Sequence, residues 1–199
     1  MDEAGIMIDV SNAGERTFRD ITKASIRPII ASHSNAWALC PKRPNLKDDQ
    51  MKALAASGGI VFVSFSAHAL DSTFAAKERS LVRRNRDRIA RFRASLTGDS
   101  VIKEQRVAEY LRKQYDRIRP PLGRVVDHID YIVKLIGIDH VGIGSDFDGA
   151  AVTPKGLEDV SCLPNLTREL MKRGYTASDI TKLYGFNFIR ALKIMEPFQ

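Results

Sequence analysis

Cysteine is scarce in this sequence of 199 residues, which contains only Cys40 and Cys162. Two thiols without a Cys-x-x-Cys spacing favour two buried, reduced cysteines over a disulfide framework. Long apolar runs are also missing, so no segment reaches the roughly 18 apolar residues that suggest a membrane-spanning helix. Residues 1–4 lack the basic and apolar regions of a secretory leader. We therefore expect no membrane partner and a cytoplasmic location.

Positive charge is plentiful but confined to one segment. The net charge of the chain is +7, whereas residues 77–119 hold 14 Lys and Arg against 6 Asp and Glu, which leaves −1 for the remainder. Such a segment can bind nucleic acid or an acidic surface. Aromatic residues that would stack on bases are few there, being limited to Phe92, Tyr110 and Tyr115. We therefore predict a solvated pair of helices and no nucleic-acid partner.

Short apolar runs alternate with helix-like stretches along the chain. The runs that we expect to form strands are residues 6–10, 28–32, 60–65 and 140–145. The stretches that we expect to form helices are residues 14–24, 48–56, 80–96, 101–118, 125–136, 165–173 and 177–195. Four such units predict an α/β fold with parallel βα repeats, in a single domain over 1–199 with a basic helical insertion at 77–119. Periodicity alone leaves open a small doubly wound sheet or half of a larger barrel.

Both architectures gather functional side chains at the carboxyl ends of the strands. His33 follows the second expected strand, where a neutral imidazole can bind zinc, although a plain hydrogen bond in a turn is the more common role. Asp146 follows the fourth expected strand and could be a general base, a partner for a substrate ammonium group, or only a turn cap. Asp148, before Gly149, is typical of a turn.

The other candidate residues suggest structural roles. His140 precedes its strand and so lies at the wrong end of it for catalysis. His128 falls within a helix and His68 after the third strand, and the sequence indicates a partner for neither. Asn165 begins a glycosylation pattern, Asn-x-Thr, but without a secretory leader we expect it to cap a helix.

Several separated motifs then point in one direction. They are residues 8–11, 28–36, 38–40, 128–149, 156–161, 173–176 and 185–188. In this order they resemble the membrane (renal) dipeptidase family of metallopeptidases, including its soluble bacterial members. The resemblance implies a TIM-type (β/α)₈ barrel, of which this chain would be the C-terminal half, strands five to eight. It also implies two Zn²⁺ ions at the carboxyl face and hydrolysis of dipeptides by metal-activated water.

The resemblance assigns a role to four residues. His33 matches a zinc ligand, and Asp146 matches an aspartate that contacts the substrate and handles the proton of the tetrahedral intermediate. Asn12 stands where the family has a second histidine ligand, and an amide oxygen is a poor zinc ligand beside imidazole. Arg43 matches an arginine that grips the substrate carboxylate, but it precedes Pro44 instead of following it.

Other family ligands have no counterpart in the expected strands. The family has a His-x-Asp pair and a bridging glutamate in its N-terminal half, and here the only such pair, at residues 128–130, lies in an expected helix. We therefore expect the activity of this chain alone to be impaired. The alternative hypothesis is a non-catalytic half-barrel that associates with a second copy or with a missing N-terminal half. In a completed barrel, the 77–119 insertion could be a lid or a dimer contact.

Overall fold

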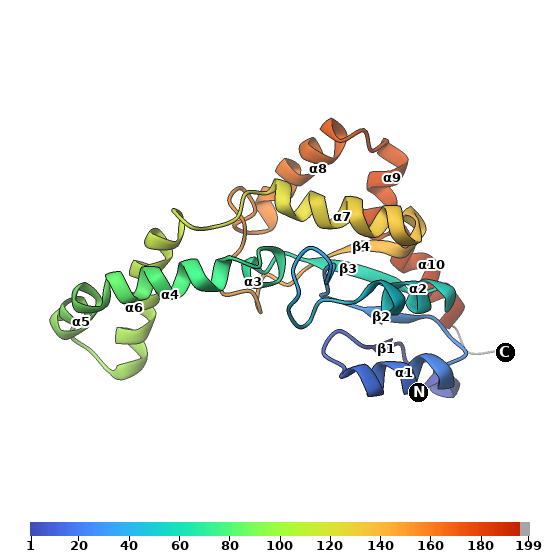
Figure 1. The fold of residues 1–199 in the computed structure, drawn as a ribbon, viewed down its shortest axis with the longest axis horizontal. Helices are drawn as coiled ribbons and strands as arrows, with labels where there is room; N and C mark the ends of the chain where they lie inside the picture. Colours follow the sequence, from blue (N-terminus) through green and yellow to red (C-terminus); the bar gives the residue numbers. More distant parts are fainter. Residues whose placement is uncertain (196–199) are drawn as a thin grey trace.

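A four-stranded parallel sheet forms the centre of the molecule (Figure 1), and the computed structural model describes residues 1–195 of the chain. The strands are β1 (Ile8–Asp9), β2 (Ile29–Ala31), β3 (Ile60–Ser64) and β4 (Val141–Ser145). Each strand pairs in parallel with the next one along the chain. The predicted α/β fold with parallel βα repeats is therefore confirmed, and all of the expected strands are present.

The spatial order of the strands separates the two architectures that the sequence left open. In a doubly wound sheet the strand order reverses at a switch point, so neighbours in space are not always neighbours in sequence. Here the order is β1-β2-β3-β4, without a reversal. A sequential order is the one found around a (β/α)₈ barrel. The sheet is thus a segment of barrel wall, with β1 and β4 as its two edges.

One face of this sheet carries the core. Side chains alternate between faces along a strand, and the parallel register aligns Ala31 with Val61. Ile29, Ala31 and Val61 are all 0% exposed, whereas Ile30 and Phe62, which point the other way, are half-buried. Helices α1 (Glu15–Ala24), α2 (Asp48–Ala56) and α7 (Gly123–Ile136) supply the apolar residues that share this core. Each aliphatic side chain buried there contributes about 1.5 to 3 kcal/mol.

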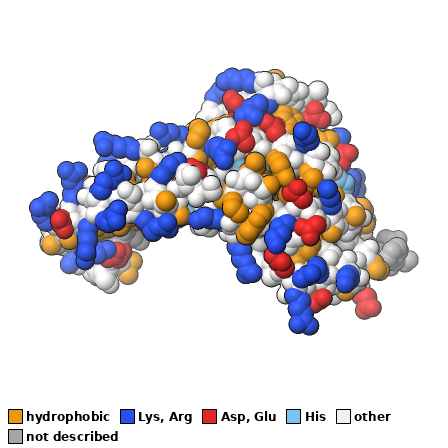
Figure 2. All heavy atoms as spheres, in the orientation of Figure 1, with side chains coloured by type: hydrophobic (Ala, Val, Ile, Leu, Met, Phe, Trp, Pro, Cys, Tyr) orange, Lys and Arg blue, Asp and Glu red, His pale blue; other side chains and the backbone are white. Residues whose placement is uncertain are grey.

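The basic segment projects from the sheet as a helical arm (Figure 1). After the short helix α3 (Ala67–Leu70), the arm comprises α4 (Phe74–Arg84), α5 (Arg86–Ser95) and α6 (Ser100–Tyr115). Lys and Arg side chains are spread over its visible surface (Figure 2), and α5 contains no buried residue. Phe92 and Tyr110 stack with ring centroids 4.8 Å apart, which joins α5 to α6. That this arm is an insertion into a single domain stays a prediction.

The prediction of two arm helices is wrong, because Asn85 divides the first of them. The backbone of Asn85 leaves helical geometry at φ −101° and ψ 6°. Its side-chain amide donates to the carbonyl of Leu81 at 2.9 Å. A short polar side chain that bonds the preceding turn competes with continuation of a helix. The charged residues that follow cannot compensate by packing, since they face solvent.

Two expectations near the C-terminus are also wrong. The expected helix over residues 177–195 is divided into α9 (Ala177–Thr181), a wide turn over Lys182–Phe186, and α10 (Asn187–Met195). The break lets Asn187 donate to the carbonyls of Ile138 and Val141 at 2.7 and 2.8 Å, which anchors α10 beside the start of β4. Asn165 lies inside the first turn of α8 (Leu163–Lys172) and donates to Gly156, so it is not the helix cap.

The expected reduced cysteines are confirmed as free thiols. Cys40 is buried, but Cys162 is only half-buried, so the expectation of two buried thiols holds for one of them. Burial raises the pKa of the Cys40 thiol, which keeps it protonated and unreactive. Within residues 1–195, no helix is both long and apolar enough to cross a bilayer.

Candidate functional site

The candidate residues lie along one edge of the sheet. Because all strands run in parallel, their carboxyl ends meet at this edge: Asn12 follows β1, His33 follows β2 and Asp146 follows β4. The sheet curves, so that Gly144 in β4 lies against the backbone of Ser32, where an added Cβ atom would collide with the Ser32 carbonyl oxygen. No hydrogen bond between described residues joins the two side chains. The structure therefore places them on one rim, the carboxyl edge of the sheet, without a hydrogen bond between them.

His33 is held by a chain of hydrogen bonds that begins at Asp9. The Ser32 hydroxyl donates to Oδ2 of Asp9 at 2.5 Å, and its oxygen lies 2.8 Å from Nδ1 of His33. On the other side of the ring, Nε2 lies 3.0 Å from the side-chain nitrogen of Asn12. Ser11 completes the support, because its hydroxyl accepts from the backbone N–H of His33 at 3.1 Å and donates to Asp9 at 2.7 Å.

This network assigns the proton of the imidazole. Ser32 has one hydroxyl hydrogen, which it donates in the hydrogen bond to the carboxylate of Asp9. The hydrogen in the bond between Ser32 and His33 must therefore come from the imidazole, so Nδ1 is the donor. The neutral ring then carries its lone pair on Nε2, the atom that faces Asn12. A metal ligand needs such a lone pair, fixed by a partner on the other nitrogen. In this structure, however, the amide of Asn12 donates to it.

Asp9 remains ionised in this network. Burial tends to raise the pKa of its carboxyl group, but hydrogen bonds from Ser32 and Ser11 outweigh burial and lower the pKa. A carboxylate that accepts several hydrogen bonds is stabilised in its charged form. Asp9, Ser11 and Ser32 have no role that the sequence alone suggests. Only their position next to Asn12 and His33 could have pointed to them.

Two asparagines fix the loop that follows His33. The side chain of Asn35 spans the backbone of Ser64 in β3, donating to its oxygen at 3.1 Å and accepting from its nitrogen at 3.0 Å. Asn45 accepts from the backbone of Asn35 at 3.1 Å and donates to Cys40 and Ala69 at 2.8 and 2.7 Å. Both side chains are buried with their polar atoms paired, which makes the loop a rigid support.

The structure gives a partner to both histidines that the sequence left unassigned, since His68 lies 3.1 Å from Glu78 and His128 pairs with two backbone groups. His128 is 0% exposed in α7, and Nδ1 accepts from the backbone N–H of Ala36 at 3.1 Å. Nε2 donates to the carbonyl of Leu70 at 3.1 Å. Burial lowers the pKa of His128 to about 4, so the ring is neutral and structural. The expected structural role of His140 agrees with its own bond, 2.8 Å from Nδ1 to the carbonyl of Gly59.

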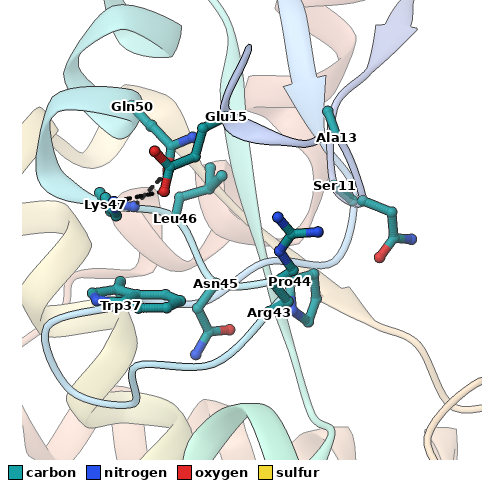
Figure 3. A pocket seen from close by; sticks show the side chains of 11 residues that line it. Ser11, Ala13, Glu15, Trp37, Arg43, Pro44, Asn45, Leu46, Lys47 and Gln50 are labelled. Carbon is teal, nitrogen blue, oxygen red and sulfur yellow. Dashed lines mark hydrogen bonds and ion pairs between the residues drawn. The ribbon is translucent and has the colours of Figure 1, made fainter. Parts of the chain in front are cut away.

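Arg43 and Asn12 line one small pocket of about 80 Å³, together with Trp37 and Lys47. Figure 3 shows the Arg43 side chain rising from its loop toward the segment that contains Ser11 and Ala13. Arg43 is exposed and makes no hydrogen bond or ion pair within residues 1–195.

The nearby carboxylate in this pocket is already paired with another cation. Lys47 lies 2.6 Å from Glu15. This contact, more than the charge of Arg43, holds the pKa of Glu15 below its usual range. The guanidinium of Arg43 is therefore available for another anion.

Asp146 sits on a strained turn at the end of β4. Ser145 and Asp146 have φ angles of 39° and 62°, in the left-handed region that non-glycine residues seldom adopt. Such strain clusters at functional sites. The carboxylate of Asp146 lies against Gly149, in the space that a Cβ atom at this position would occupy. The carboxylate accepts no hydrogen bond within the described residues, which argues against a turn cap.

A complete metal centre is not present in this part of the chain. Among residues 1–195, no group of three or more His, Cys, Asp or Glu side chains could hold a metal ion. His33 supplies one imidazole and Asn12 one amide, while structural zinc sites use four protein ligands and catalytic sites three. The described residues therefore do not fit the zinc pair that the resemblance implied, and further ligands would have to come from elsewhere.

Comparison with known proteins gives one consistent result. A family model described as membrane dipeptidase (peptidase family M19) matches residues 1–199. Dipeptidase aclJ of Aspergillus oryzae is 33% identical, over 98% of this chain and 36% of that protein. A protein in the pqqA 5′ region of Klebsiella pneumoniae is 35% identical, over 94% of this chain and 54% of that protein. The chain thus spans only a third to a half of the length of such curated relatives.

Solved structures agree with the sequence matches. The probable dipeptidase PvdM from Pseudomonas aeruginosa has a TM-score of 0.74 at 36% identity, and the match covers 98% of this chain and 52% of that one. A metallopeptidase from Rhodobacter sphaeroides, bound to a phosphinate mimic of the dipeptide L-Ala-D-Ala, has a TM-score of 0.72 at 28% identity. That match covers 98% of this chain and 44% of the other. Coverage near one half, with sequential strands, is consistent with part of a barrel.

Proposed function

The chain belongs to the membrane dipeptidase family, peptidase family M19, and on that premise we propose that it contributes one half of a dipeptidase active site. The observation that carries this proposal is the support of His33. Its ring is held by Ser32 and Asp9 with Nε2 as the acceptor atom, at the carboxyl edge of a parallel sheet. That is the geometry in which an imidazole can bind a metal ion.

We propose a role for each of three residues, His33, Arg43 and Asp146. His33 is one metal ligand in a centre whose other ligands lie outside the described residues. Arg43, exposed and without a hydrogen bond in the described chain, binds the carboxylate of a dipeptide. Asp146, strained and with a carboxylate free of hydrogen bonds there, contacts the substrate and accepts a proton.

The edges of the sheet indicate where a complementary half would add. Within residues 1–195, β1 and β4 each have one unpaired side, a row of backbone groups that another strand can satisfy. Next to β4, the turn before α10 and α10 itself expose Phe186, Ile189 and Leu192 at 62%, 48% and 43%. Exposed apolar side chains such as these favour association. We propose that a second copy, or a half of the kind present in longer relatives, covers it.

A second candidate function is a non-catalytic half-barrel that acts only by association. The contact between Asn12 and His33 favours it, because the amide donates to the Nε2 lone pair that a metal would need. Among residues 1–195, no group of three or more His, Cys, Asp or Glu side chains could hold a metal ion, which also favours this hypothesis. Under this hypothesis the fold is retained and the chemistry is lost.

A metal and hydrolysis assay on the full chain tests the proposed function. We expect bound Zn²⁺ and turnover of a dipeptide panel once the N-terminal half of a longer relative is added to supply the remaining ligands, with turnover falling by about 100-fold or more in Asp146→Asn if this group handles a proton. Metal content is measured by elemental analysis after gel filtration, and Asp148→Asn serves as the matched control in the same turn. If neither metal nor turnover is found after the complementary half is added, the result contradicts the dipeptidase proposal and favours the non-catalytic half-barrel.

Replacing Asn12 with histidine should strengthen metal binding. The change removes the amide that occupies Nε2 of His33 and adds a second imidazole, so we expect Zn²⁺ affinity to rise by about 10- to 100-fold. Calorimetric titration measures the affinity. Asn12→Ala is the matched control, because it frees the lone pair without adding a ligand. Equal affinities for the two variants would show that His33 and residue 12 do not share a metal.

A further inference from the structure

A pocket of about 400 Å³ lies between the basic arm and the loop after β4. One wall is α6, with Arg112, Lys113 and Tyr115, and the other begins at Phe147, one residue after Asp146. Small-molecule sites commonly occupy about 300 to 1,000 Å³. The pocket is therefore large enough for a small ligand.

The charged side chains that line this pocket, Arg112, Lys113 and Arg119 against Asp116 and Glu158, leave a net charge of +1. Its two carboxylates, Asp116 and Glu158, each lie 3.1 Å from the guanidinium of Arg119. Arg112 and Lys113 are exposed on α6 and form no hydrogen bond or ion pair within residues 1–195. Two cations thus remain without a partner on one wall, and such groups attract an anion into a confined site.

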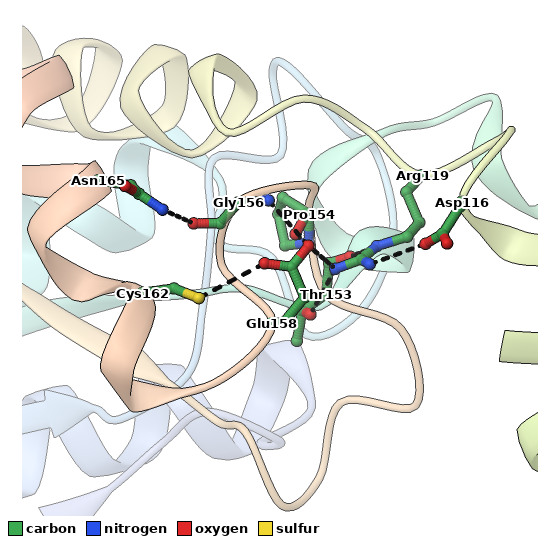
Figure 4. A network of polar contacts seen from close by, with 8 residues as sticks. All are labelled: Asp116, Arg119, Thr153, Pro154, Gly156, Glu158, Cys162 and Asn165. Atoms are coloured by element: carbon green, nitrogen blue, oxygen red, sulfur yellow. Dashed lines mark hydrogen bonds and ion pairs between the residues drawn. The ribbon is translucent and has the colours of Figure 1, made fainter. Parts of the chain in front are cut away.

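Arg119 makes the pocket a fixed structure (Figure 4). Its side chain is 8% exposed and donates to the carbonyls of Thr153 and Pro154 at 2.6 and 2.7 Å. These bonds join the base of the arm to the loop that forms the opposite wall. A site that is already formed loses less conformational entropy when a ligand binds.

The apolar part of the lining suits a carbon chain. Phe147 packs edge-on against Phe65, with ring centroids 5.5 Å apart, which fixes its ring between the sheet edge and the pocket. Ala150, Ala151 and Val152 continue this wall. A ligand with a short aliphatic stem and an anionic end would contact both the apolar wall and the two cations.

We propose that this pocket, framed by Phe147, Arg112 and Lys113, binds the acidic side chain of a dipeptide whose peptide group lies at Asp146. The assignment rests on the proposed dipeptidase function and names its substrate class. Arg112 and Lys113 are then specificity-determining residues, which select a carboxylate-bearing side chain over a neutral one of equal size.

Calorimetric titration of the full chain tests this assignment with two probes, alanyl-glutamate and alanyl-glutamine, which differ in one charge. At about 0.05 M salt, where screening is weak, we expect alanyl-glutamate to bind about fivefold or more tightly. The preference should fall below about twofold in the double variant Arg112→Gln, Lys113→Gln. Arg117→Gln is the matched control, since Arg117 is exposed on the same segment and does not line the pocket.

Three results would overturn the assignment. They are equal binding of the two dipeptides, a preference that survives in the double variant, and displacement of alanyl-glutamate by an equal concentration of inorganic phosphate, which would indicate a general anion site. Hydrolysis is followed in the same samples. A charge preference supports the pocket assignment whether or not turnover is seen, whereas an absence of turnover after addition of the N-terminal half of a longer relative contradicts only the proposed activity, so the two failures are distinguishable.

Discussion

Replacing His128 with alanine is expected to lower the free energy of unfolding by about 3 to 5 kcal/mol. The imidazole is 0% exposed, and its two nitrogens pair the N–H of Ala36 with the carbonyl of Leu70. Alanine leaves both backbone groups buried and without a partner, and it leaves a cavity in α7. Each unsatisfied group costs about 1 to 3 kcal/mol.

Denaturant unfolding of the wild type and the variant measures this loss. His140→Ala is the matched control, because His140 is half-buried and makes one hydrogen bond, to Gly59. We expect this control to cost about 1 kcal/mol. Equal losses for the two variants would contradict the role of His128 as a cross-link. Because Ala36 lies in the loop after His33, the variant should also loosen the rim.

Acid is expected to destabilise the fold through the same residue. The pKa of His128 is about 4 in the folded chain, against 6.5 for an unperturbed imidazole. Between these values the unfolded chain binds a proton that the folded chain does not. The stabilisation that neutral His128 provides is therefore complete above pH 6.5 and is lost progressively as the pH falls to 4. The loss amounts to about 3 kcal/mol.

Two measurements check the acid effect. Denaturant unfolding at about pH 7.5 and 4.5 gives the total loss in the free energy of unfolding. A His128→Asn variant, which has no imidazole to titrate at that position, should lose less. In NMR spectra, the signal of the Cε1 proton of His128 is assigned by its absence in that variant. Its chemical shift should report a titration of the imidazole near pH 4. A titration midpoint close to 6.5 would contradict the buried, neutral ring.

The strands are predictable because the pattern that marks them is local. Residues 60–65 and 140–145 are short apolar runs, and β3 and β4 lie within them. The expected first strand, 6–10, is too long, since β1 is an edge strand and only Ile8–Asp9 meets β2 in register. The same local pattern also locates the side chains at the strand ends, which is why the sequence places His33 after β2 and Asp146 after β4.

The support of the site is not predictable, because it depends on register between strands. Asp9 reaches Ser32 only because β1 pairs with β2 so that Asp9 lies opposite Ile30. Likewise, the bond from Asn12 to His33 spans 21 residues. His128 meets Ala36 and Leu70 across 92 and 58 residues. No periodicity in one segment contains such information.

Because β1 is short, the residues that support His33 depend for their positions on the edge of the sheet. β1 spans two residues and pairs on one side only, yet Asp9, Ser11 and Asn12 depend on it for their positions. Edges with few contacts open at a lower free energy than cores do. The hydrogen bonds that support His33 can thus open while the core stays folded. A neighbouring chain that adds a strand beside β1 would suppress this opening. It would thereby stabilise the position of His33 without contacting the imidazole.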